Sequence, residues 1–468
     1  MRLTKIVCTL GPATANREGI LALYRGGMNI ARINFSHGNR EDHAKLVRLI
    51  QDINKKEGIA IGLLLDTKGA EIRTGDVKEP IPVKVGEEVV FSPRPLPNEK
   101  RPVIHVNYEA FSEDVRQTDR ILLDNGDMSF DIVSVGQNGS VVAKSRDTGS
   151  IGSRRHVNLP GADISLPSLT ESDWKDLEMG IKENMDFTAL SFIRTAEEVA
   201  EVQAFLRKKK STMRVIAKIE TKQAVENIDE IIAVSDGIMV ARGDLGAEIP
   251  YELIPALQDY MVEMCRQAGK PVIVATHMLE SMIKNPMPTR AEVTDVAHAA
   301  MTRTDATMLS GETAMGKHPF HAIDAMARIL KQTEEHLQPL DAMVPEEQCD
   351  EYAARAHGAV VMAQALQAAA IVVLTHTGDT ARSVSGLRPA MPVFALTDDP
   401  STVHALQICY GVQPLYLPFK KDPEANAIKA IEMVKKAGGF KKGEQIVLVS
   451  QTKVAGGTVS TVNIRSIA

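Results

Sequence analysis

Short apolar segments that end in polar or charged residues recur along much of the chain. Within 235–246, the apolar residues Ile238 to Val240 are followed by an arginine, a glycine and an aspartate. A buried strand that ends in charges and passes through a glycine turn into a helix is a common way to build a ligand site. A single stretch of this kind could equally be a loop with a surface salt bridge. Its recurrence favours the ligand site.

Eight segments share this pattern, and helix-like sequence follows most of them. In chain order they are KIVCTLG, MNIARINFSHG, IGLLLDTKG, MDFTALSFIR, RVIAKIE, GIMVARGDLG, PVIVATHML and DATMLSGE. Eight βα units predict an α/β fold, the closed (β/α)8 or TIM barrel. In such a barrel the residues at the carboxyl ends of the strands gather at one mouth, where active sites form.

Polar side chains two residues apart should share one face of a strand. The groups of this kind are Arg32, Asn34 and Ser36; Lys218 and Glu220; Arg242 and Asp244; Ser310 and Glu312. A strand with its polar face in water would show the same alternation, but Asn and Gly are poor strand formers on such a face. We therefore expect these groups to face the barrel mouth.

Between Arg73 and about His156 the character of the chain changes. Proline and glycine become frequent, and short alternating segments flank a hairpin signal at 137–139, Gln-Asn-Gly. This predicts a small β-domain inserted after the third strand, at the rim of the mouth, where it could act as a lid. The segment VNLPGADISLP that follows could be its hinge.

A second alternating region begins after about Pro345. Five strand-like segments, the early ones separated by helical stretches, predict an open α/β domain. The predicted division of the chain is 1–73 with 157–344 for the barrel, 74–156 for the lid and 345–468 for the C-terminal domain.

The bulk composition narrows the class of protein. The 468 residues are 44% hydrophobic and 24% charged, and the formal net charge of -6 argues against a broad surface for nucleic acid or an anionic membrane. The 4 cysteines are far apart and lack metal-ligand spacing, which indicates free thiols in a reducing compartment. No stretch is long and apolar enough to span a bilayer, and the N-terminus leads directly into a strand, so we expect a cytoplasmic protein.

The polar strand ends suggest phosphate chemistry. Glu220 and Asp244 could together hold Mg²⁺, which takes a few carboxylates and leaves positions for water and substrate; alternatively, each forms an ion pair at the rim. Lys218 would be desolvated there and would need an anion, and Arg32 and Arg73 could grip a phosphate. Cations around a divalent metal suit phosphoryl transfer.

A second oxygen-rich group lies at the ends of the second and third strands. It could hold a monovalent cation or form a polar network, and its members are Asn34, Ser36, Asp66 and Thr67. Near Gly243, backbone N–H groups at a helix start could bind an anion. The sequence has neither a P-loop nor a dinucleotide-binding or protein-kinase signature, so any nucleotide must be held in another way.

Taken together, these motifs resemble the pyruvate kinase family over essentially the full length. The most specific are LLLDTKGAEIRTG, DGIMVARGDLGAEIP, ATHMLESMIKNPMPTRAE and MLSGETAMGK. The resemblance implies transfer of a phosphoryl group from phosphoenolpyruvate to ADP, giving pyruvate and ATP at the end of glycolysis. It also implies that the inserted lid domain is a small β-barrel. The implied cofactors are Mg²⁺ (or Mn²⁺) and K⁺, and the implied partners are a homotetramer and a phosphorylated allosteric effector.

The resemblance also assigns residues to the phosphoryl group and the metal. It implies that Lys218 neutralises the phosphoryl group in transfer, that Arg32 contacts it, and that Glu220 and Asp244 hold Mg²⁺. The residues that would contact phosphoenolpyruvate or the metal-bound pyruvate are Gly243, Asp244 and Thr276.

Further roles follow from the same resemblance. The implied K⁺ ligands are Asn34, Ser36, Asp66 and Thr67, and Glu71 is the residue type of K⁺-dependent members. The residues where the family places the nucleotide phosphates are Asn34, His37 and Arg73. The network implied to relay a proton to the enolate consists of Thr276, Ser310 and Glu312, and which group donates stays open.

Several positions depart from the family pattern. They are His277 for the usual Gln, Ala70 for Pro, Ser172 for a nucleotide-contacting Lys, and Met287 for Arg. In the turn HTGDTARS of the C-terminal domain, Asp379 takes the usual position of an Arg, and a carboxylate there would repel a sugar phosphate. The remaining groups of this candidate effector site, which could form an anion nest, are Thr375, Thr377, Gly378 and Thr380.

Two other functions would be compatible with some of the same residues. A Mg²⁺-dependent barrel lyase or aldolase acting on a pyruvate enolate would turn over without ADP. A catalytically silent metabolite sensor would tolerate loss of Lys218, Glu220 or Asp244, and all three are present.

Overall fold

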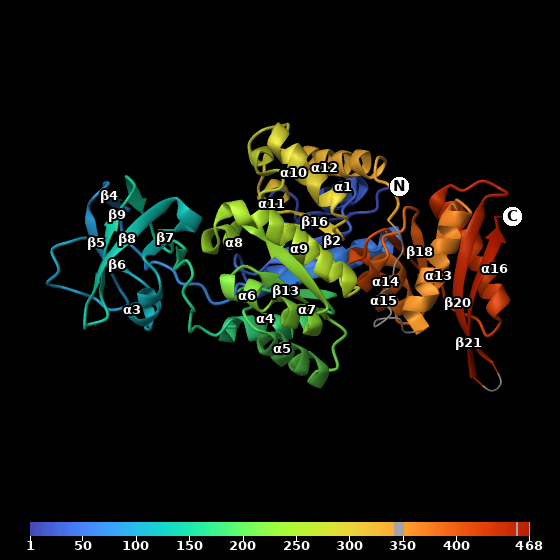
Figure 1. The fold of residues 1–468 in the computed structure, drawn as a ribbon, viewed down its shortest axis with the longest axis horizontal. Coiled ribbons are helices and arrows are strands. Elements are labelled where there is room, and N and C mark those ends of the chain that lie inside the picture. Colours follow the sequence, from blue (N-terminus) through green and yellow to red (C-terminus); the bar gives the residue numbers. More distant parts are fainter. Residues whose placement is uncertain (341–350, 455–456, 468) are drawn as a thin grey trace.

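The chain forms three bodies in a row, shown by a computed structural model that describes residues 1–340, 351–454 and 457–467. A β-rich body lies at one end, a barrel wrapped in helices lies in the middle, and an α/β body lies at the other end (Figure 1). The predicted fold class is confirmed. The exact domain boundaries stay predictions.

Eight parallel strands close the central barrel in the order β1-β16-β15-β14-β13-β12-β3-β2. Their bounds are β1 (Lys5–Thr9), β2 (Ile30–Asn34), β3 (Gly62–Asp66), β12 (Phe187–Leu190), β13 (Arg214–Ile219), β14 (Gly237–Ala241), β15 (Val272–Ala275) and β16 (Ala306–Leu309). Each lies within the segment predicted for it. Both faces of these strands are buried, one against the helices and one inside the barrel, which explains their nearly continuous apolar sequences.

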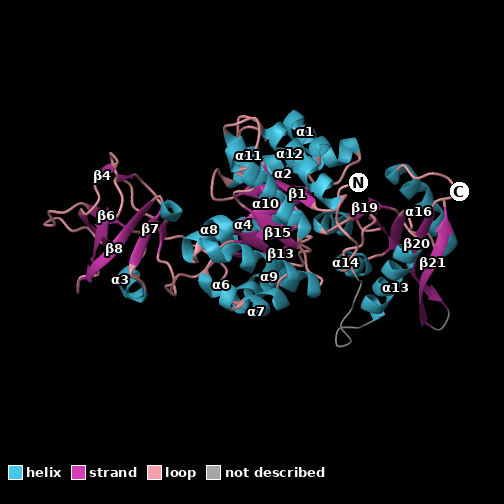
Figure 2. Ribbon diagram, turned by 45° about the horizontal axis from the view of Figure 1, so that its top comes forward, coloured by secondary structure: helices cyan, strands magenta, loops and turns pink. Residues whose placement is uncertain are grey.

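Helices cover the outside of the barrel, as Figure 2 shows in cyan around the magenta strands. Local signals fix where they begin: Thr170 and Asp173, for example, form a capping box at the start of α4. The helices are α1 (Arg17–Gly26), α2 (Arg40–Glu57), α4 (Glu171–Lys182), α5 (Ala196–Lys208), α6 (Lys222–Glu226), α7 (Ile228–Val234), α8 (Arg242–Glu248), α9 (Ile254–Gln267), α10 (Arg290–Met301), α11 (Gly311–Ala314) and α12 (Pro319–Glu334), with short 3-10 turns η3 (Tyr251–Leu253) and η4 (Glu280–Ile283).

The lid is a curled six-stranded sheet, ordered β11-β7-β8-β9-β5-β6, with a two-stranded ribbon of β10 and β4. The predicted Gln-Asn-Gly turn joins β8 to β9, and Gly139 adopts the positive φ of 81° that such a turn requires. The elements are β4 (Ile81–Val83), β5 (Glu88–Ser92), β6 (Val103–His105), α3 (Phe111–Asp114), η1 (Val115–Gln117), β7 (Arg120–Leu123), η2 (Asp124–Gly126), β8 (Met128–Val135), β9 (Val141–Ser145), β10 (Gly149–Ile151) and β11 (Val157–Asn158).

The C-terminal body is a five-stranded sheet ordered β19-β18-β17-β20-β21, in which only β20 and β21 pair antiparallel. Apolar residues of α13 and α14 pack on one face of the sheet, and those of α16 pack on the other. The elements are α13 (Glu351–Ala365), β17 (Ala370–Leu374), α14 (Asp379–Gly386), β18 (Val393–Thr397), α15 (Pro400–Ala405), η6 (Leu406–Ile408), β19 (Val412–Tyr416), α16 (Pro423–Gly438), β20 (Gln445–Val454) and β21 (Gly457–Ser466).

The C-terminal body closes the floor of the barrel, at the amino ends of the strands. Asp305, just before β16, accepts hydrogen bonds from Arg388 through both carboxylate oxygens and from the backbone N–H of Tyr410 at 2.9 Å. Fully buried Lys5, which opens β1, donates to the carbonyl of Val412, and burial lowers its pKa to about 7. One apolar core continues from the barrel interior into this interface.

Two sequence expectations concern the chain as a whole. Three of the cysteines, Cys8, Cys265 and Cys409, are buried free thiols, and Cys349 lies outside the described residues. No helix in the described ranges has the length and apolar character needed to cross a bilayer.

Candidate active site

Lys218 is the centre of a buried charge cluster at the carboxyl mouth of the barrel. It lies on β13, and its Nζ is 2.8 Å from Glu220 Oε1, 3.2 Å from Asp66 Oδ1 and 2.7 Å from the hydroxyl oxygen of Ser191. Only 8% of Lys218 is exposed. Burial alone would lower its pKa, but the two carboxylates outweigh burial and raise the pKa above the ordinary value. The amine is therefore a fixed positive charge.

Arg32 adds a second cation to this cluster. Its Nε donates to Asp66 Oδ2 at 2.6 Å, and its Nη1 donates to the hydroxyl of Thr9 at 2.8 Å. Burial opposes ionisation of Asp66, but Arg32 and Lys218 hold the pKa of this carboxyl below its usual range. Asp66 thus fixes both cations at the ends of neighbouring strands.

Glu220 follows β13 directly and is 1% exposed. Its Oε2 accepts the backbone N–H of Phe192 at 2.7 Å, and its Oε1 is paired with Lys218 Nζ at 2.8 Å. Burial raises the pKa of Glu220, and the negative charge of Asp244 adds to this, against the opposing charge of Lys218. A buried carboxylate beside a second carboxylate that raises its pKa is a suitable environment for a divalent cation.

The end of β15 forms the next wall of the mouth. The backbone N–H of Gly243, in the first turn of α8, donates to Thr276 Oγ1 at 2.7 Å. Thr276 and His277 both have positive φ, 66° and 55°, which is costly for residues with side chains and is typical of functional sites. His277 is exposed, and its ring lies close to Gly243.

Ser310 and Glu312 lie beyond the end of β16. Glu312 is 1% exposed, and its carboxylate accepts the backbone N–H groups of Ser310 at 2.7 Å and Leu279 at 3.1 Å. Burial raises the pKa of this carboxyl. The two residues contact each other, but no hydrogen bond joins either of them to the Lys218 cluster within the described residues.

The prediction that alternate residues share a strand face is wrong at three places. Arg242 and Asp244 lie in α8 because β14 ends at Ala241, and Arg242 turns away to pair with Asp295 at 2.6 Å. Ser310 is the N-cap of α11, which contains Glu312. Ser36 lies beyond the end of β2. The strand period stops where the helix or turn begins, so the spacing of two loses its meaning there.

The candidate K⁺ ligands lie at the ends of adjacent strands. Asn34 and Asp66 are register partners on β2 and β3, and Asn34 Oδ1 accepts the backbone N–H of Ser36 at 3.1 Å. Ser191 bridges this group to Lys218, because its hydroxyl also donates to the carbonyl of Thr67 at 2.7 Å. Sequence reasoning missed Ser191 and Phe192, although the motif SFIR contains both.

The three candidate nucleotide residues make no hydrogen bond to one another among the described residues. Arg73 pairs with Glu71 at 2.6 Å and donates to the carbonyl of Arg154 in the lid at 2.7 Å. His37 is exposed after β2, and its carbonyl contacts the ring of His43. Asn34 alone of the three belongs to the strand-end group described above.

Ser172 and Met287, two departures from the family pattern, lie away from the cluster. Ser172 accepts hydrogen bonds from Arg40 at its carbonyl and hydroxyl oxygens. Met287 is 75% exposed.

In the candidate effector turn, Asp379 occupies hydrogen-bond donors that a phosphate would need. Its carboxylate accepts from the hydroxyl of Thr377 and from Arg382. Thr375 Oγ1 accepts the N–H of Gly378 at 2.9 Å, and Gly378 has a φ of 84°. Thr380 Oγ1 lies 3.4 Å from a guanidinium nitrogen of Arg355.

Comparison with known proteins decides the family. The model described as "Pyruvate kinase, barrel domain" matches residues 1–323, and the one described as "Pyruvate kinase, alpha/beta domain" matches residues 353–465. The chain belongs to the pyruvate kinase family. Membership makes it a phosphotransferase, as the resemblance implied.

Individual pyruvate kinases are similar over nearly the full length. Plastidial pyruvate kinase 2 of Arabidopsis thaliana is 41% identical over 99% of this chain and 80% of its own length. The pyruvate kinase of Dictyostelium discoideum is 39% identical over 96% of this chain and 90% of its own. A crystal structure of a pyruvate kinase from Cryptosporidium parvum superimposes with a TM-score of 0.93 at 35% identity, covering 100% of this chain and 96% of that one.

Proposed function

We propose that this pyruvate kinase family member transfers the phosphoryl group of phosphoenolpyruvate to ADP, with Mg²⁺ and K⁺, in the final step of glycolysis. The observation that carries the proposal is the buried cluster in which Asp66 holds Arg32 and Lys218 side by side at the barrel mouth. Two cations fixed next to each other in a site of low dielectric are suited to a phosphoryl group whose charge is spread over its oxygens.

The donor set at the mouth fits Mg²⁺. Glu220 and Asp244 would hold the ion, which would supply Lewis-acid neutralisation of the transferring group. Mg²⁺ keeps several water or substrate ligands and so needs few carboxylates.

The oxygen-rich group fits a monovalent cation by its chemistry. Hydroxyl, amide, carboxylate and carbonyl oxygens at the ends of β2 and β3 are hard donors, and the residues that would hold K⁺ are Asn34, Ser36, Asp66 and Thr67. Glu71 is committed to Arg73 by an ion pair.

During transfer, the bond from phosphorus to the enol oxygen breaks and a bond to the terminal oxygen of ADP forms. Lys218 and Arg32 would neutralise the phosphoryl group in passage, and the N–H groups at the start of α8 near Gly243 would hold the substrate carboxylate. Thr276 Oγ1 accepts the N–H of Gly243 and so orients that helix start. Arg73, Asn34 and His37 would hold the nucleotide phosphates.

The enolate left behind must take a proton on carbon to become pyruvate. Thr276, Ser310 and Glu312 would form the relay. Burial raises the pKa of Glu312, which favours its protonated, proton-holding form. The identity of the immediate donor stays open between these groups.

We also infer a cytoplasmic homotetramer. Large apolar side chains at the surface support association: Tyr251 is 84% exposed and Met287 is 75% exposed. For the candidate effector site at Thr375, Thr377, Gly378 and Thr380, we propose an anion nest for a phosphorylated ligand other than fructose 1,6-bisphosphate, since the carboxylate of Asp379 beside it would repel a sugar phosphate.

A coupled assay of pyruvate formation tests the proposal. The purified chain, supplied with phosphoenolpyruvate, ADP, Mg²⁺ and K⁺, should form pyruvate and ATP in equal amounts. Omitting ADP or chelating Mg²⁺ should abolish pyruvate formation. Turnover without ADP would instead indicate a lyase, and absence of turnover under all conditions would indicate a silent sensor.

A further inference from the structure

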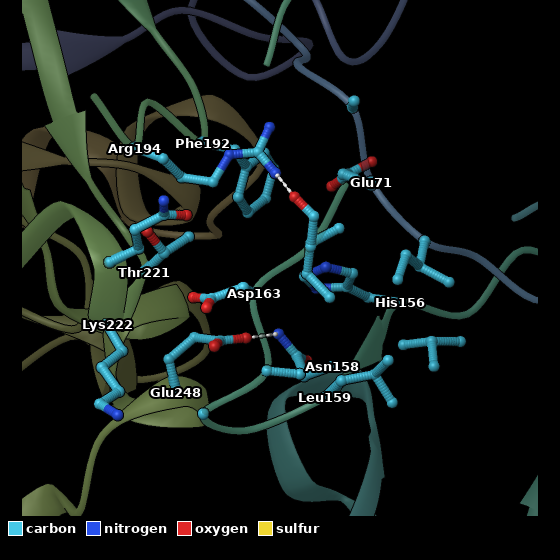
Figure 3. Close-up of a pocket in the computed structure, with 17 residues that line it drawn as sticks. Glu71, His156, Asn158, Leu159, Asp163, Phe192, Arg194, Thr221, Lys222 and Glu248 are labelled. Carbon is cyan, nitrogen blue, oxygen red and sulfur yellow. Dashed lines mark hydrogen bonds between the residues drawn. The ribbon is translucent and has the colours of Figure 1, made fainter. Parts of the chain in front are cut away.

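A pocket lies beside the hinge of the lid, on the side of the barrel loops (Figure 3). One wall is the hinge, residues 156–164, and the other comprises the loops after β12 and β13 and the end of α8. The volume open to the centres of water-sized molecules is about 50 Å³. The enclosed part therefore admits a small polar group, with the rest of a ligand in the open mouth.

The pocket is separate from the charge cluster of the proposed active site. Phe192 stands between the two: its backbone N–H donates to Glu220 Oε2 on one side, and its ring lies against His156, with centroids 5.9 Å apart, on the other. The pocket lining includes Phe192 and His156 but neither Lys218 nor Arg32. A molecule in this pocket would therefore not occupy the phosphoryl site.

The cations that line the pocket are already engaged. Arg194 donates to the carbonyls of Ile164 and Leu166 and so fastens the hinge to the barrel. The ammonium of Lys222 lies 3.4 Å from Glu226 on the same helix, α6. Arg194 also has Glu198 at 3.6 Å. The positive charges are thus balanced by groups other than the remaining acids of the pocket.

Two of those acids, Glu248 and Asp163, point into the pocket (Figure 3). Burial raises the pKa of Glu248 to about 7, and the negative charge of Asp244 adds to this, while hydrogen bonds from Asn158 at 3.4 Å and from the backbone of Gly161 offset it only in part. The carboxylate of Asp163 accepts no hydrogen bond among the described residues, although its backbone N–H is fixed by Gln117 of the lid at 3.1 Å.

The amide of Asn158 provides an independent observation. Asn158 is 4% exposed, lines the pocket and directs its side chain toward Glu248 (Figure 3). Its Oδ1 is buried without a hydrogen-bond partner. A buried acceptor without a donor is costly, and it is satisfied when a ligand brings the donor.

We propose that this hinge pocket binds a small organic cation, with an ammonium group that donates to Glu248, Asp163 and Asn158 Oδ1 and an apolar body that packs on Ile72, Leu159 and Phe192. The acceptors and the unbalanced acids select a positively charged donor. The aromatic ring of Phe192 adds a favourable surface for a cation.

An occupant of this pocket would contact the hinge and the barrel at once. Asn158, Leu159 and Asp163 belong to the segment that connects lid and barrel, whereas Glu248 belongs to the barrel. A ligand that bridges them favours one lid position and so changes the kinetic constants for substrates bound under the lid. This regulatory part rests on the proposed function; the binding part does not.

Binding of benzylammonium, measured by isothermal titration calorimetry and located by crystallography of the full chain, tests the site. We expect saturable binding in the hinge pocket, weakened about 100-fold or more in the Asp163→Asn/Glu248→Gln variant, since each of the two lost charge-assisted hydrogen bonds should weaken binding about tenfold or more. Glu432→Gln, an exposed carboxylate in the C-terminal body, should bind like the wild type, and benzyl alcohol, the neutral analogue, should not bind measurably.

Three results would overturn the binding proposal: no saturable binding, equal binding of benzyl alcohol, or undiminished affinity in the double variant. Should that variant fail to fold, Asp163→Asn alone serves, because Asp163 is exposed. Saturating benzylammonium should also change KM for phosphoenolpyruvate in the wild type but not in the variant. Binding without any such change would overturn the coupling to the lid, and absence of all turnover would instead count against the proposed function.

Discussion

Lys218 Nζ lies 2.8 Å from Glu220 Oε1, and both side chains are buried at the end of one strand. The amine thus stands between a carboxylate that can hold a metal and Asp66, which also fixes Arg32. Because desolvated charges are stable only when paired, this arrangement contributes both to stability and to the proposed chemistry.

Replacing Lys218 by methionine should lower kcat by about 100-fold or more, because it removes a positive charge that stabilises the transferring group. It should also lower the free energy of unfolding by about 3–5 kcal/mol, since buried Glu220 loses its cation and Asp66 keeps only Arg32. Steady-state kinetics and urea denaturation measure the two effects. Lys222→Met, four residues on and exposed, is the matched control, and near-normal turnover of Lys218→Met would remove the lysine from the mechanism.

Substituting tetramethylammonium for K⁺ should remove most of the activity. The strand-end oxygens can hold a small bare cation, whereas a large organic ion neither enters nor supplies a local charge. The assay compares initial rates at constant ionic strength. Undiminished rates would contradict the proposed K⁺ site at Asn34 and Asp66. They would also contradict the K⁺ dependence inferred from the residue type of Glu71.

Fructose 1,6-bisphosphate should leave the activity of the wild type unchanged. The carboxylate of Asp379 accepts from Thr377 and Arg382, and it would repel a sugar phosphate. Asp379→Ala should free both donors and strengthen binding of inorganic phosphate, measured by titration calorimetry. Strong activation of the wild type by the bisphosphate would contradict this reading of the turn.

Arg388→Met should lower the free energy of unfolding by about 3–5 kcal/mol, because it leaves the buried carboxylate of Asp305 without its cation. Arg328→Met is the control: its partner Asp324 is exposed, and loss of an exposed pair costs at most about 1 kcal/mol. Urea denaturation measures both. Equal shifts in the two variants would show that the interface pair adds nothing beyond a surface pair.

The contribution of His404 to stability should depend on pH. Burial lowers its pKa, but the hydrogen bond and charge of Asp186 outweigh burial and raise the pKa above its ordinary value. A pKa raised on folding gives stability that is complete below the unfolded pKa and is lost as the pH rises through the folded pKa.

The loss of stability in His404→Gln should therefore be greatest near about pH 5.5, at about 1 kcal/mol, and smaller near about pH 8.5. Urea midpoints of wild type and variant across this range measure it. His376→Gln, whose pair with Asp398 is exposed, should show little effect at any pH. A difference that grows toward high pH would contradict the assigned direction.

The barrel strands could be predicted because both of their faces are buried, so each appears in the sequence as a short run of apolar residues. Each run ends where the strand reaches the barrel mouth. Lys218, Glu220 and Asp66 stood at those ends, and the structure brings them into contact. Asp244 and Glu312 were selected because each lies two residues from another polar residue, as on one face of a strand. That reason was wrong, since both residues lie in helices that follow the strands.

Ser191 and Phe192 could not be identified from the sequence, because their contributions to the site arise only from tertiary contacts. A serine at the end of an apolar strand carries no sign that its hydroxyl will bridge Thr67 and Lys218. Phe192 acts through its backbone N–H, and its positive φ of 54° depends on the surrounding loops. Likewise, the outward turn of Arg242 depends on Asp295, more than fifty residues away in sequence.

The apolar core shared by the barrel floor and the C-terminal body has a practical consequence for engineering. Val7, Ile30 and Phe187 pack in the same cluster as Leu406 and Val412. A fragment truncated after residue 340 would present these side chains to solvent and would be prone to aggregate rather than to serve as a minimal catalyst. Shuffling of modules between relatives should therefore exchange the floor of the barrel together with the body that seals it.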